Sequence, residues 1–305
     1  MTAAVKSFYD IPGWFRWLDM TMFHTLLGAQ SDSAPGVLVE LGTYLGKSTV
    51  VIGDHVRDGD RFVAVDLFGD TDVLGESPAD VANRRESTKS YGTLTRRTFE
   101  ENYLALHTCL PEIVQGPSSE VVDHVEPATA RFIHVDASHM YAHVNVDVRN
   151  ARALMRPAGI AVFDDYRGEH TPGVAAAVWA AVARDGLIPL ALTTQKFYGV
   201  YDDPEPYASV LRDLFGGDDR YQWETQQIMG RDVLRARMVP PKPRAPQPPQ
   251  PPSVDVDALS ARLADRLTPL LRDAIARPAV APAPGPGATA FARRLLSRRA
   301  SNGEH

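Results

Sequence analysis

Short apolar runs alternate with amphipathic stretches over the first two thirds of the chain. The apolar runs have the length of buried strands, and the stretches between them repeat apolar residues at helical spacing. Strands are predicted at 37–41, 62–66, 112–115, 131–136, 159–163, 187–193 and 197–201. Helices are predicted at 47–57, 92–108, 118–124, 142–155 and 173–184. This order is typical of an α/β fold with a mostly parallel, doubly wound sheet, and the last two strands would form a final antiparallel hairpin.

Residues 1–34 are rich in aromatic side chains and precede the first strand. Trp14, Leu18, Met22 and Leu26 recur at helical spacing, which predicts an amphipathic helix that packs on the sheet or on a second subunit. The alternative is a lid, in which aromatic rings cover a ligand pocket and the stretch Arg84–Tyr91 adds polar contacts from the other side. Periodicity alone does not separate these two interpretations.

An acidic turn rich in glycine follows the first predicted strand, in the sequence ELGTYLGKST. The strand stops near Glu40, and the segment Gly42, Thr43 to Gly46 lets backbone amides approach a ligand before a helix begins near Ser48. The spacing G-x-x-x-G differs from the dinucleotide fingerprint G-x-G-x-x-G and is one residue short of the phosphate loop. A carboxylate at this turn would repel a triphosphate, so the sequence favours a ligand with a positive charge.

Acidic residues also follow three other predicted strands. Asp66 stands about 20 residues after the glycine turn, where a carboxylate can bind ribose hydroxyls, and the alternative is an ordinary strand-end turn residue. Asp136 follows the fourth strand, and Asp164 and Asp165 follow the fifth. Parallel strands bind ligands at their carboxyl ends, so these acids predict a small-molecule site there. Three carboxylates at neighbouring strand ends also suggest a metal ion, and the alternative is that they cap helices or face solvent.

These motifs resemble a known family of enzymes. The glycine turn resembles motif I of class I S-adenosylmethionine-dependent methyltransferases. The sequence DASHMY from Asp136, followed by PAG from Pro157 and DDY from Asp164, is similar to the branch with macrocin-type sugar O-methyltransferases and cephalosporin hydroxylase-like proteins. The likeness covers roughly residues 35–201. Two positions depart from the branch: its usual D-G-D-H reads D-A-S-H here, so the second acid is missing, and its usual P-G-G reads P-A-G.

The resemblance implies a Rossmann-like class I methyltransferase fold over residues 35–238, with S-adenosyl-L-methionine and Mg²⁺ as cofactors. The implied cofactor-binding residues are Glu40, Gly42, Thr43, Gly46, Ser48, Asp66, Ser118 and Asp136. The implied metal ligands are Asp136, Asp164 and Asp165.

The resemblance also indicates which residues perform the chemistry. In catechol-type relatives a lysine takes the position of His139, three residues after Asp136. Asp136 and His139 are therefore the predicted catalytic residues, and His139 is the candidate general base. His139 could instead bind the metal or cap the next helix, and His143, one turn later, is the second candidate. An alcohol is a poor nucleophile, so the protein must activate and align the acceptor oxygen, and Mg²⁺ would do both.

Charge and composition exclude several classes of protein. The chain has 305 residues and a net charge of −6, with −11 in residues 1–238 and +5 in residues 239–305. The acidic body argues against nucleic-acid binding. No apolar run reaches the roughly 18 residues of a membrane span and no secretion signal is recognised, so a cytoplasmic protein is expected. Cys109, the single cysteine, excludes an intramolecular disulfide and a thiolate zinc site, and we expect it to be buried.

The composition changes after Met238. Pro240–Pro252 contains eight prolines in thirteen residues, which predicts an extended linker at 239–252. An amphipathic helix is predicted at 253–277, and a Pro/Ala-rich basic tail at 278–305 is expected to be disordered. The alternative for the tail is contact with an anionic membrane or an acidic partner.

Three functions are consistent with these observations. The first is S-adenosylmethionine- and Mg²⁺-dependent methyl transfer to a hydroxyl of a sugar, oligosaccharide or glycosylated natural product. The second is O-methylation of a small hydroxylated metabolite such as a catechol. The third is an inactive, cofactor-binding scaffold whose tail recruits partners. The acceptor and the oligomeric state, including a homo-oligomer, stay open.

Overall fold

The computed structural model of the chain describes residues 5–92, 94–239, 261 and 263–269. The chain divides into two units, Met1–Pro241 and Lys242–His305. The predicted linker beyond residue 239 and the predicted tail lie outside the described residues. Of the predicted helix at 253–277, the described residues are helical, and Leu263 and Leu267 are exposed.

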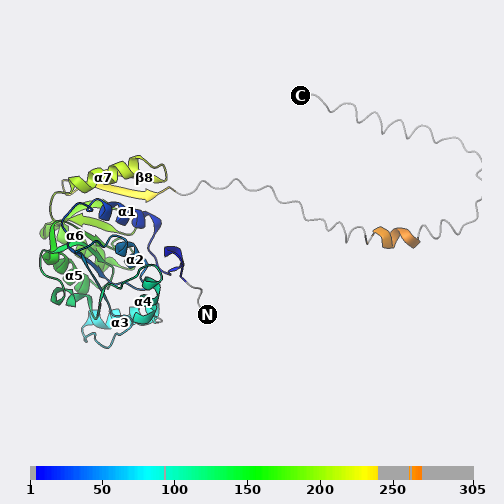
Figure 1. The fold of residues 1–305 in the computed structure, drawn as a ribbon, viewed down its shortest axis with the longest axis horizontal. Coiled ribbons are helices and arrows are strands. Elements are labelled where there is room, and N and C mark those ends of the chain that lie inside the picture. The colour runs from blue at the N-terminus through cyan, green and yellow to red at the C-terminus, as the bar shows by residue number, and fades with distance from the viewer. Residues whose placement is uncertain (1–4, 93, 240–260, 262, 270–305) are drawn as a thin grey trace, which may run out of the picture. The chain divides into compact units, whose positions relative to one another are not determined.

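The first unit alternates helices and strands (Figure 1). Its strands are β1 (Val37–Leu41), β2 (Arg61–Asp66), β3 (Glu112–Gln115), β4 (Ala130–Val135), β5 (Met155–Phe163), β6 (Ile188–Leu192), β7 (Phe197–Val200), β8 (Tyr221–Ile228) and β9 (Arg231–Met238). Its helices are α1 (Trp17–Gly28), α2 (Lys47–Gly53), α3 (Pro78–Tyr91), α4 (Arg96–Leu104), α5 (Tyr141–Leu154), α6 (Pro172–Arg184) and α7 (Glu205–Gly216), with 3₁₀ helices η1 (Phe8–Asp10) and η2 (Ser118–Asp123).

In the described part of the chain, nine strands form one sheet with the order β3-β2-β1-β4-β5-β7-β6-β9-β8. Strands β1 to β5 pair in parallel, and β7 runs antiparallel to both β5 and β6. This confirms the predicted α/β fold with a mostly parallel sheet and an antiparallel pair near its end. Because β7 is antiparallel, its first residue lies at the same edge of the sheet as the last residue of β5.

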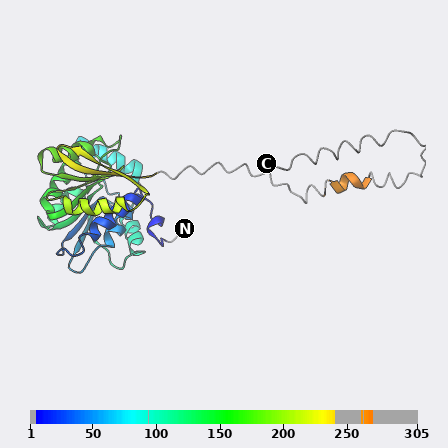
Figure 2. The same ribbon diagram turned by 90° about the horizontal axis from the view of Figure 1, so that it is seen from above.

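Alternate residues of the central strands pack on opposite faces of the sheet. Leu38 belongs to a core cluster with residues of α1, α2 and α7, whereas Val37 and Val39 belong to a second cluster with residues of α5 and α6. Helices α1 and α7 lie side by side on the first face (Figure 2). Burial on both faces explains why the parallel strands read as continuous apolar runs.

The N-terminal segment combines features of both interpretations of its sequence. In α1, Leu18, Met22 and Leu26 are buried in the first core cluster, so this helix packs on the sheet. Trp14 precedes the helix, is 66% exposed and lines the cavity described below.

Several elements differ from their predictions. The helix predicted at 92–108 forms as the shorter α4, and α3, which precedes this range, was not predicted. Helix α3 was missed because Asn83 is its one buried residue, so it carries no apolar stripe. The edge hairpin β8–β9 and helix α7 were also missed. Cys109 is exposed rather than buried, since it lies in the short connection between α4 and β3.

Within the described residues, no helix combines the length and the apolar character that crossing a membrane requires.

A buried ion pair fixes the edge of the sheet opposite the cavity. The guanidinium of Arg131, in β4, is completely buried. Its Nη2 lies 2.8 Å from Oδ2 of Asp60, the residue just before β2. Asp60 Oδ1 also accepts a hydrogen bond of 2.8 Å from the backbone N–H of Gly36, next to β1. Burial would raise the pKa of Asp60, but hydrogen bonds from Arg131 and Arg57 outweigh it and lower that pKa to about 2.

We expect Asp60→Asn to lower the free energy of unfolding by about 3–5 kcal/mol, because it leaves the Arg131 guanidinium buried without a counter-charge. Denaturant unfolding at neutral pH measures the loss. Glu112→Gln is the control: it breaks the exposed 2.6 Å pair with Arg61 and should cost less than about 1 kcal/mol. Equal losses in the two variants would contradict the prediction.

The contribution of the Asp60 carboxylate to the free energy of unfolding depends on pH. It is present above about pH 4 and is lost as the pH falls through 2.

Candidate active site

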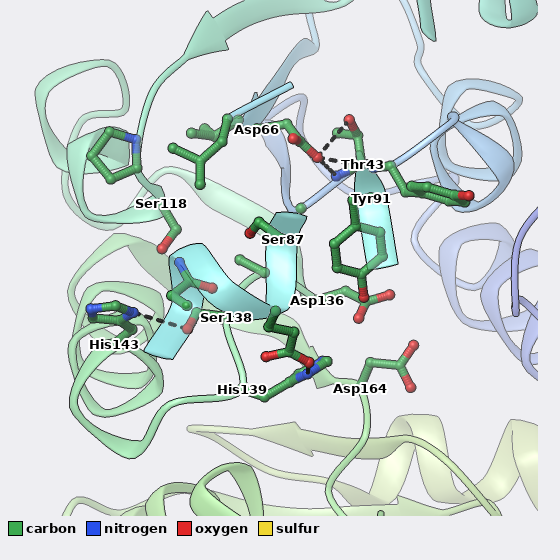
Figure 3. Close-up of a pocket in the computed structure, with 18 of the residues that line it drawn as sticks. Thr43, Asp66, Ser87, Tyr91, Ser118, Asp136, Ser138, His139, His143 and Asp164 are labelled. Atoms are coloured by element: carbon green, nitrogen blue, oxygen red, sulfur yellow. Dashed lines mark hydrogen bonds and ion pairs between the residues drawn. The ribbon is translucent and has the colours of Figure 1, made fainter. Parts of the chain in front are cut away.

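A cavity of about 800 Å³ opens at the carboxyl edge of the parallel strands (Figure 3). The loops after β1 to β5, helix α3 and the segment before α1 contribute to its walls. All the site residues predicted from the sequence line this cavity, except Glu40 and Gly46. Those that line it are Gly42, Thr43, Ser48, Asp66, Ser118, Asp136, His139, Asp164 and Asp165.

The glycine turn brings the loops after β1 and β4 into contact. Gly42 has a φ of +81°, and a Cβ at this position would overlap the carbonyl oxygen of Asp136. Gly46 has a φ of +91° at the N-cap of α2, where an added Cβ would lie 3.2 Å from the ring of Phe99. Both positions therefore require glycine, the first for close approach and the second to start the helix.

Asp66 holds this turn in place. Its Oδ2 accepts hydrogen bonds from the backbone N–H groups of Thr43 (2.7 Å) and Tyr44 (2.9 Å), and its Oδ1 accepts one from Phe68 (2.7 Å). The carboxylate therefore orients the backbone that faces the cavity. A role in ribose binding stays a prediction, because a ribose hydroxyl would share oxygens that already accept these bonds.

Glu40 lies behind the cavity wall. It is completely buried and accepts hydrogen bonds from Ser48 Oγ (2.5 Å) and His134 Nδ1 (2.9 Å). The register of β1 and β4 pairs Glu40 directly with His134. Burial raises the pKa of Glu40 to about 7. Glu40 therefore supports Ser48, which lines the cavity, rather than facing the cavity itself.

A buried lysine, which sequence reasoning missed, stands beside the acids. The ammonium group of Lys196 contacts the carboxylate of Asp164, lies 3.0 Å from His134 Nε2 and is 4.0 Å from Asp136 Oδ2. Burial would lower the pKa of Lys196, but the carboxylates of Asp164 and Asp136 outweigh it and raise that pKa. The signal in the sequence was a lone lysine at the start of an apolar strand run.

The charge of Lys196 determines the state of its neighbours. Burial and the adjacent ammonium group hold the pKa of His134 well below its usual range, so this imidazole is neutral, donates from Nδ1 to Glu40 and accepts from Lys196 at Nε2. Burial opposes ionisation of Asp164, but Lys196 outweighs it and lowers the pKa of Asp164. Asp136 has no such close cation, and burial together with the Asp164 charge raises its pKa well above its usual range.

His139 lies between two carboxylates. Its Nδ1 is 2.6 Å from Glu86 Oε1, on α3, and its Nε2 is 3.1 Å from Asp165 Oδ2. Burial would lower the pKa of His139, but these carboxylates outweigh it and raise the pKa to about 9. At neutral pH the imidazole therefore holds its proton, and both nitrogens act as donors. In this arrangement His139 is a cation, not the free base that the sequence suggested.

His143 is hydrogen-bonded differently. Its Nε2 lies 3.1 Å from Asp80 Oδ1, and its Nδ1 lies 2.9 Å from Ser138 Oγ (Figure 3). Hydrogen bonds from Ser77 lower the pKa of Asp80, so this carboxylate is ionised and only accepts. In the tautomer that donates from Nε2 to Asp80, the lone pair of Nδ1 faces the Ser138 hydroxyl.

The predicted magnesium ligands do not form one metal site. Within the described residues, ligand atoms converge in two groups, one of His134, Asp136 and Asp164, and one of Asp136, His139 and Asp165. Lys196 contacts the first group and the protonated His139 is a member of the second. A positively charged side chain of the protein thus already lies at each of the two groups, so the residues as arranged do not fit a Mg²⁺ ion.

An aromatic wall borders the cavity near these acids. Trp14 stacks on Tyr44 with ring centroids 5.5 Å apart, and Tyr91 meets both rings edge-on. Tyr91 belongs to the stretch that the lid interpretation singled out, and Figure 3 shows its ring reaching toward Asp136. The cavity therefore combines an apolar ring surface with hydrogen-bonding carboxylates.

The comparisons with known proteins identify the class of protein. Residues 39–166 match the family model of a methyltransferase domain. This segment carries the glycine turn and the acids after β1, β2, β4 and β5, and the fold around it is the predicted one. The chain therefore contains a methyltransferase domain, and the class I methyltransferase assignment made from the motifs is confirmed. No curated protein matches the chain.

Solved methyltransferase structures are similar to the chain at low identity. CalS11, described as a TDP-rhamnose 3′-O-methyltransferase of calicheamicin biosynthesis, is 17% identical, covers 62% of this chain and 82% of its own, and has a TM-score of 0.40. The O-methyltransferase NovP is 17% identical, with 61% and 81% covered and a TM-score of 0.48. An O-methyltransferase from Bacillus cereus in complex with SAH is 16% identical, with 73% and 80% covered and a TM-score of 0.32.

We expect the contribution of His139 to stability to depend on pH. Its pKa of about 9 in the folded chain lies above the ordinary value of 6.5, so the contribution is fully present below pH 6.5 and is lost as the pH rises through 9. His139→Gln should therefore lower the melting temperature more at about pH 6 than at about pH 10. Thermal unfolding across this range measures the difference, with the exposed His124→Gln as control. A pH-independent difference would contradict the prediction.

Proposed function

We propose that the chain is an S-adenosylmethionine-dependent O-methyltransferase that methylates a hydroxyl of a sugar, oligosaccharide or glycosylated natural product. One observation carries the proposal: in a methyltransferase domain, the glycine turn and the acids after β2, β4 and β5 surround one cavity. The Mg²⁺ requirement implied by the resemblance is left out, because Lys196 and His139 hold the cation positions.

The cavity suits the cofactor in both charge and shape. S-adenosylmethionine carries a sulfonium and an ammonium group, which are attracted to a wall that contains Asp66 and Asp165. The glycine turn offers a close approach to the backbone, and Ser118 lies across the cavity from Thr43 (Figure 3). We assign this part of the cavity to the cofactor.

The aromatic wall supports a ring-shaped, hydroxylated acceptor. A sugar ring has apolar faces that pack on aromatic rings such as Trp14 and Tyr91, and hydroxyl groups that donate to carboxylates such as Asp165. An acidic cavity disfavours a polyanionic acceptor such as a nucleic acid.

Methyl transfer requires that a proton leave the acceptor oxygen. As this oxygen attacks the methyl carbon, the bond from that carbon to sulfur breaks and the cofactor becomes neutral at sulfur. We assign the proton to a relay: the acceptor hydroxyl donates to Ser138 Oγ while Ser138 donates to His143 Nδ1, and Asp80 stabilises the imidazolium that forms. His139, which keeps its proton, orients Asp165 and Glu86.

We expect calorimetry to show binding of S-adenosylmethionine and its demethylated product. Gly42→Ala should weaken this binding at least tenfold, because the added Cβ pushes the glycine turn away from the loop after β4. Gly28→Ala is the matched control, since a Cβ there meets no atom within 4 Å. Preferential binding of NAD or ATP would refute the cofactor assignment.

We expect His143→Gln to lower kcat by about 10²–10⁴-fold and to change cofactor affinity little, because it removes the proton acceptor without changing the turn. Transfer of a labelled methyl group to a panel of sugars, glycosides and catechols, with chelator present, measures the rate. Ser138→Ala should produce a similar loss. Unchanged turnover in both variants would refute the proposed relay. Turnover that requires added Mg²⁺ would support the metal-dependent mechanism instead.

A further inference from the structure

The group formed by His134, Asp136 and Asp164 has the composition of a transition-metal site. One imidazole and two carboxylates offer ligand atoms that all lie within 4.8 Å of one another. Such sets bind Mn²⁺, Fe²⁺, Co²⁺ or Zn²⁺ in proteins. The sheet creates this group, because His134 and Asp136 are on and just after β4, and Asp164 follows the neighbouring strand β5.

The ammonium group of Lys196 lies among these three ligands. It contacts Asp164 directly, lies 3.0 Å from His134 Nε2 and 4.0 Å from Asp136 Oδ2, and the ring of Phe15 stands 5.1 Å away on another side. The lone pair of His134 Nε2, which a metal would need, already accepts from this ammonium group. A divalent ion at the same place would also face a buried positive charge at short range.

The backbone keeps Lys196 in this position. Its N–H donates to Thr193 Oγ1 over 2.9 Å, and its carbonyl accepts from the N–H of Thr193, also over 2.9 Å. The next residue, Phe197, begins β7 and pairs with Phe163, the last residue of β5. The lysine is thus fixed beside Asp164 by the sheet register, and its side chain is 1% exposed.

We propose that Lys196 is a built-in cation that occupies a latent metal site formed by His134, Asp136 and Asp164, and that it performs there the charge neutralisation that a divalent ion would otherwise provide. The proposal deepens the function proposed above, because it makes Lys196 a positioning residue for the acids of the methyl-transfer cavity. In this role Lys196 forms an ion pair with Asp164, while Asp136 faces the cavity.

Removal of the lysine should expose the latent site. Lys196→Ala removes both the charge and the side chain that fills the position, so the three ligands become free to bind a metal. We expect the wild-type chain to bind no Mn²⁺ at stoichiometric concentrations, which is measured by the electron paramagnetic resonance signal of free Mn²⁺. We also expect its melting temperature to stay unchanged when a chelator is added. The Lys196→Ala chain should bind one Mn²⁺ or Co²⁺, and the metal should raise its lowered melting temperature by several degrees.

Two variants control this experiment. Lys47→Ala removes a second cavity-lining lysine, which lies over the ring of Phe8 rather than among carboxylates, and should gain no metal binding. The double variant Lys196→Ala with Asp164→Asn lacks one ligand and should lose the metal binding that the single variant gains. In Co²⁺-loaded Lys196→Ala, visible absorption bands typical of nitrogen ligation would identify His134.

Two results would overturn the proposal. One is stoichiometric binding of Mn²⁺ by the wild-type chain, if the substitution Asp164→Asn abolishes this binding. This test does not depend on whether a lysine variant folds. The other is a Lys196→Ala chain that gains no metal when refolded with Mn²⁺, Co²⁺ or Zn²⁺. Calorimetry with the demethylated cofactor on the same samples separates this outcome from failure of the proposed function, because metal binding and cofactor binding are measured independently.

Discussion

The buried interaction between Lys196 and Asp164 is the contact on which the chemistry of the cavity depends. Removing either charge would leave the other unpaired in a region of low dielectric, which is strongly unfavourable. Burial and the ammonium group together keep His134 neutral, and neutral His134 donates to Glu40 behind the glycine turn. One fixed cation thus determines the hydrogen-bonding state of residues on β1, β4 and β5.

Close approach of two loops is the second constraint on the site. The turn after β1 and the loop after β4 meet at Gly42, where no side chain fits, and Asp66 holds the turn from the neighbouring strand. The acids of the cavity are therefore placed by backbone geometry at strand ends, not by flexible side chains. This placement suits methyl transfer, in which the acceptor oxygen and the methyl carbon must be aligned.

The two histidines after β4 differ because of their neighbours, not because of their position in the chain. His139 lies between the carboxylates of Glu86 and Asp165 and stays protonated at neutral pH. His143 has a carboxylate on one nitrogen and the hydroxyl of Ser138 on the other, so only one of its nitrogens faces a carboxylate. Helix α3 supplies both Asp80 and Glu86, and it therefore assigns different roles to two similar side chains.

The sequence alone determined the α/β class, the strand ends and the acids that follow them, because strand periodicity and glycine turns are local features. It did not reveal α3, whose polar sequence lacks an apolar stripe, and it placed Glu40 in the site when tertiary packing puts it behind the wall. The protonation of His139 depends on Glu86, 53 residues away, and Lys196 reaches Asp164 only because β7 runs antiparallel to β5. These properties arise from burial and from contacts between distant segments, which only the tertiary structure decides.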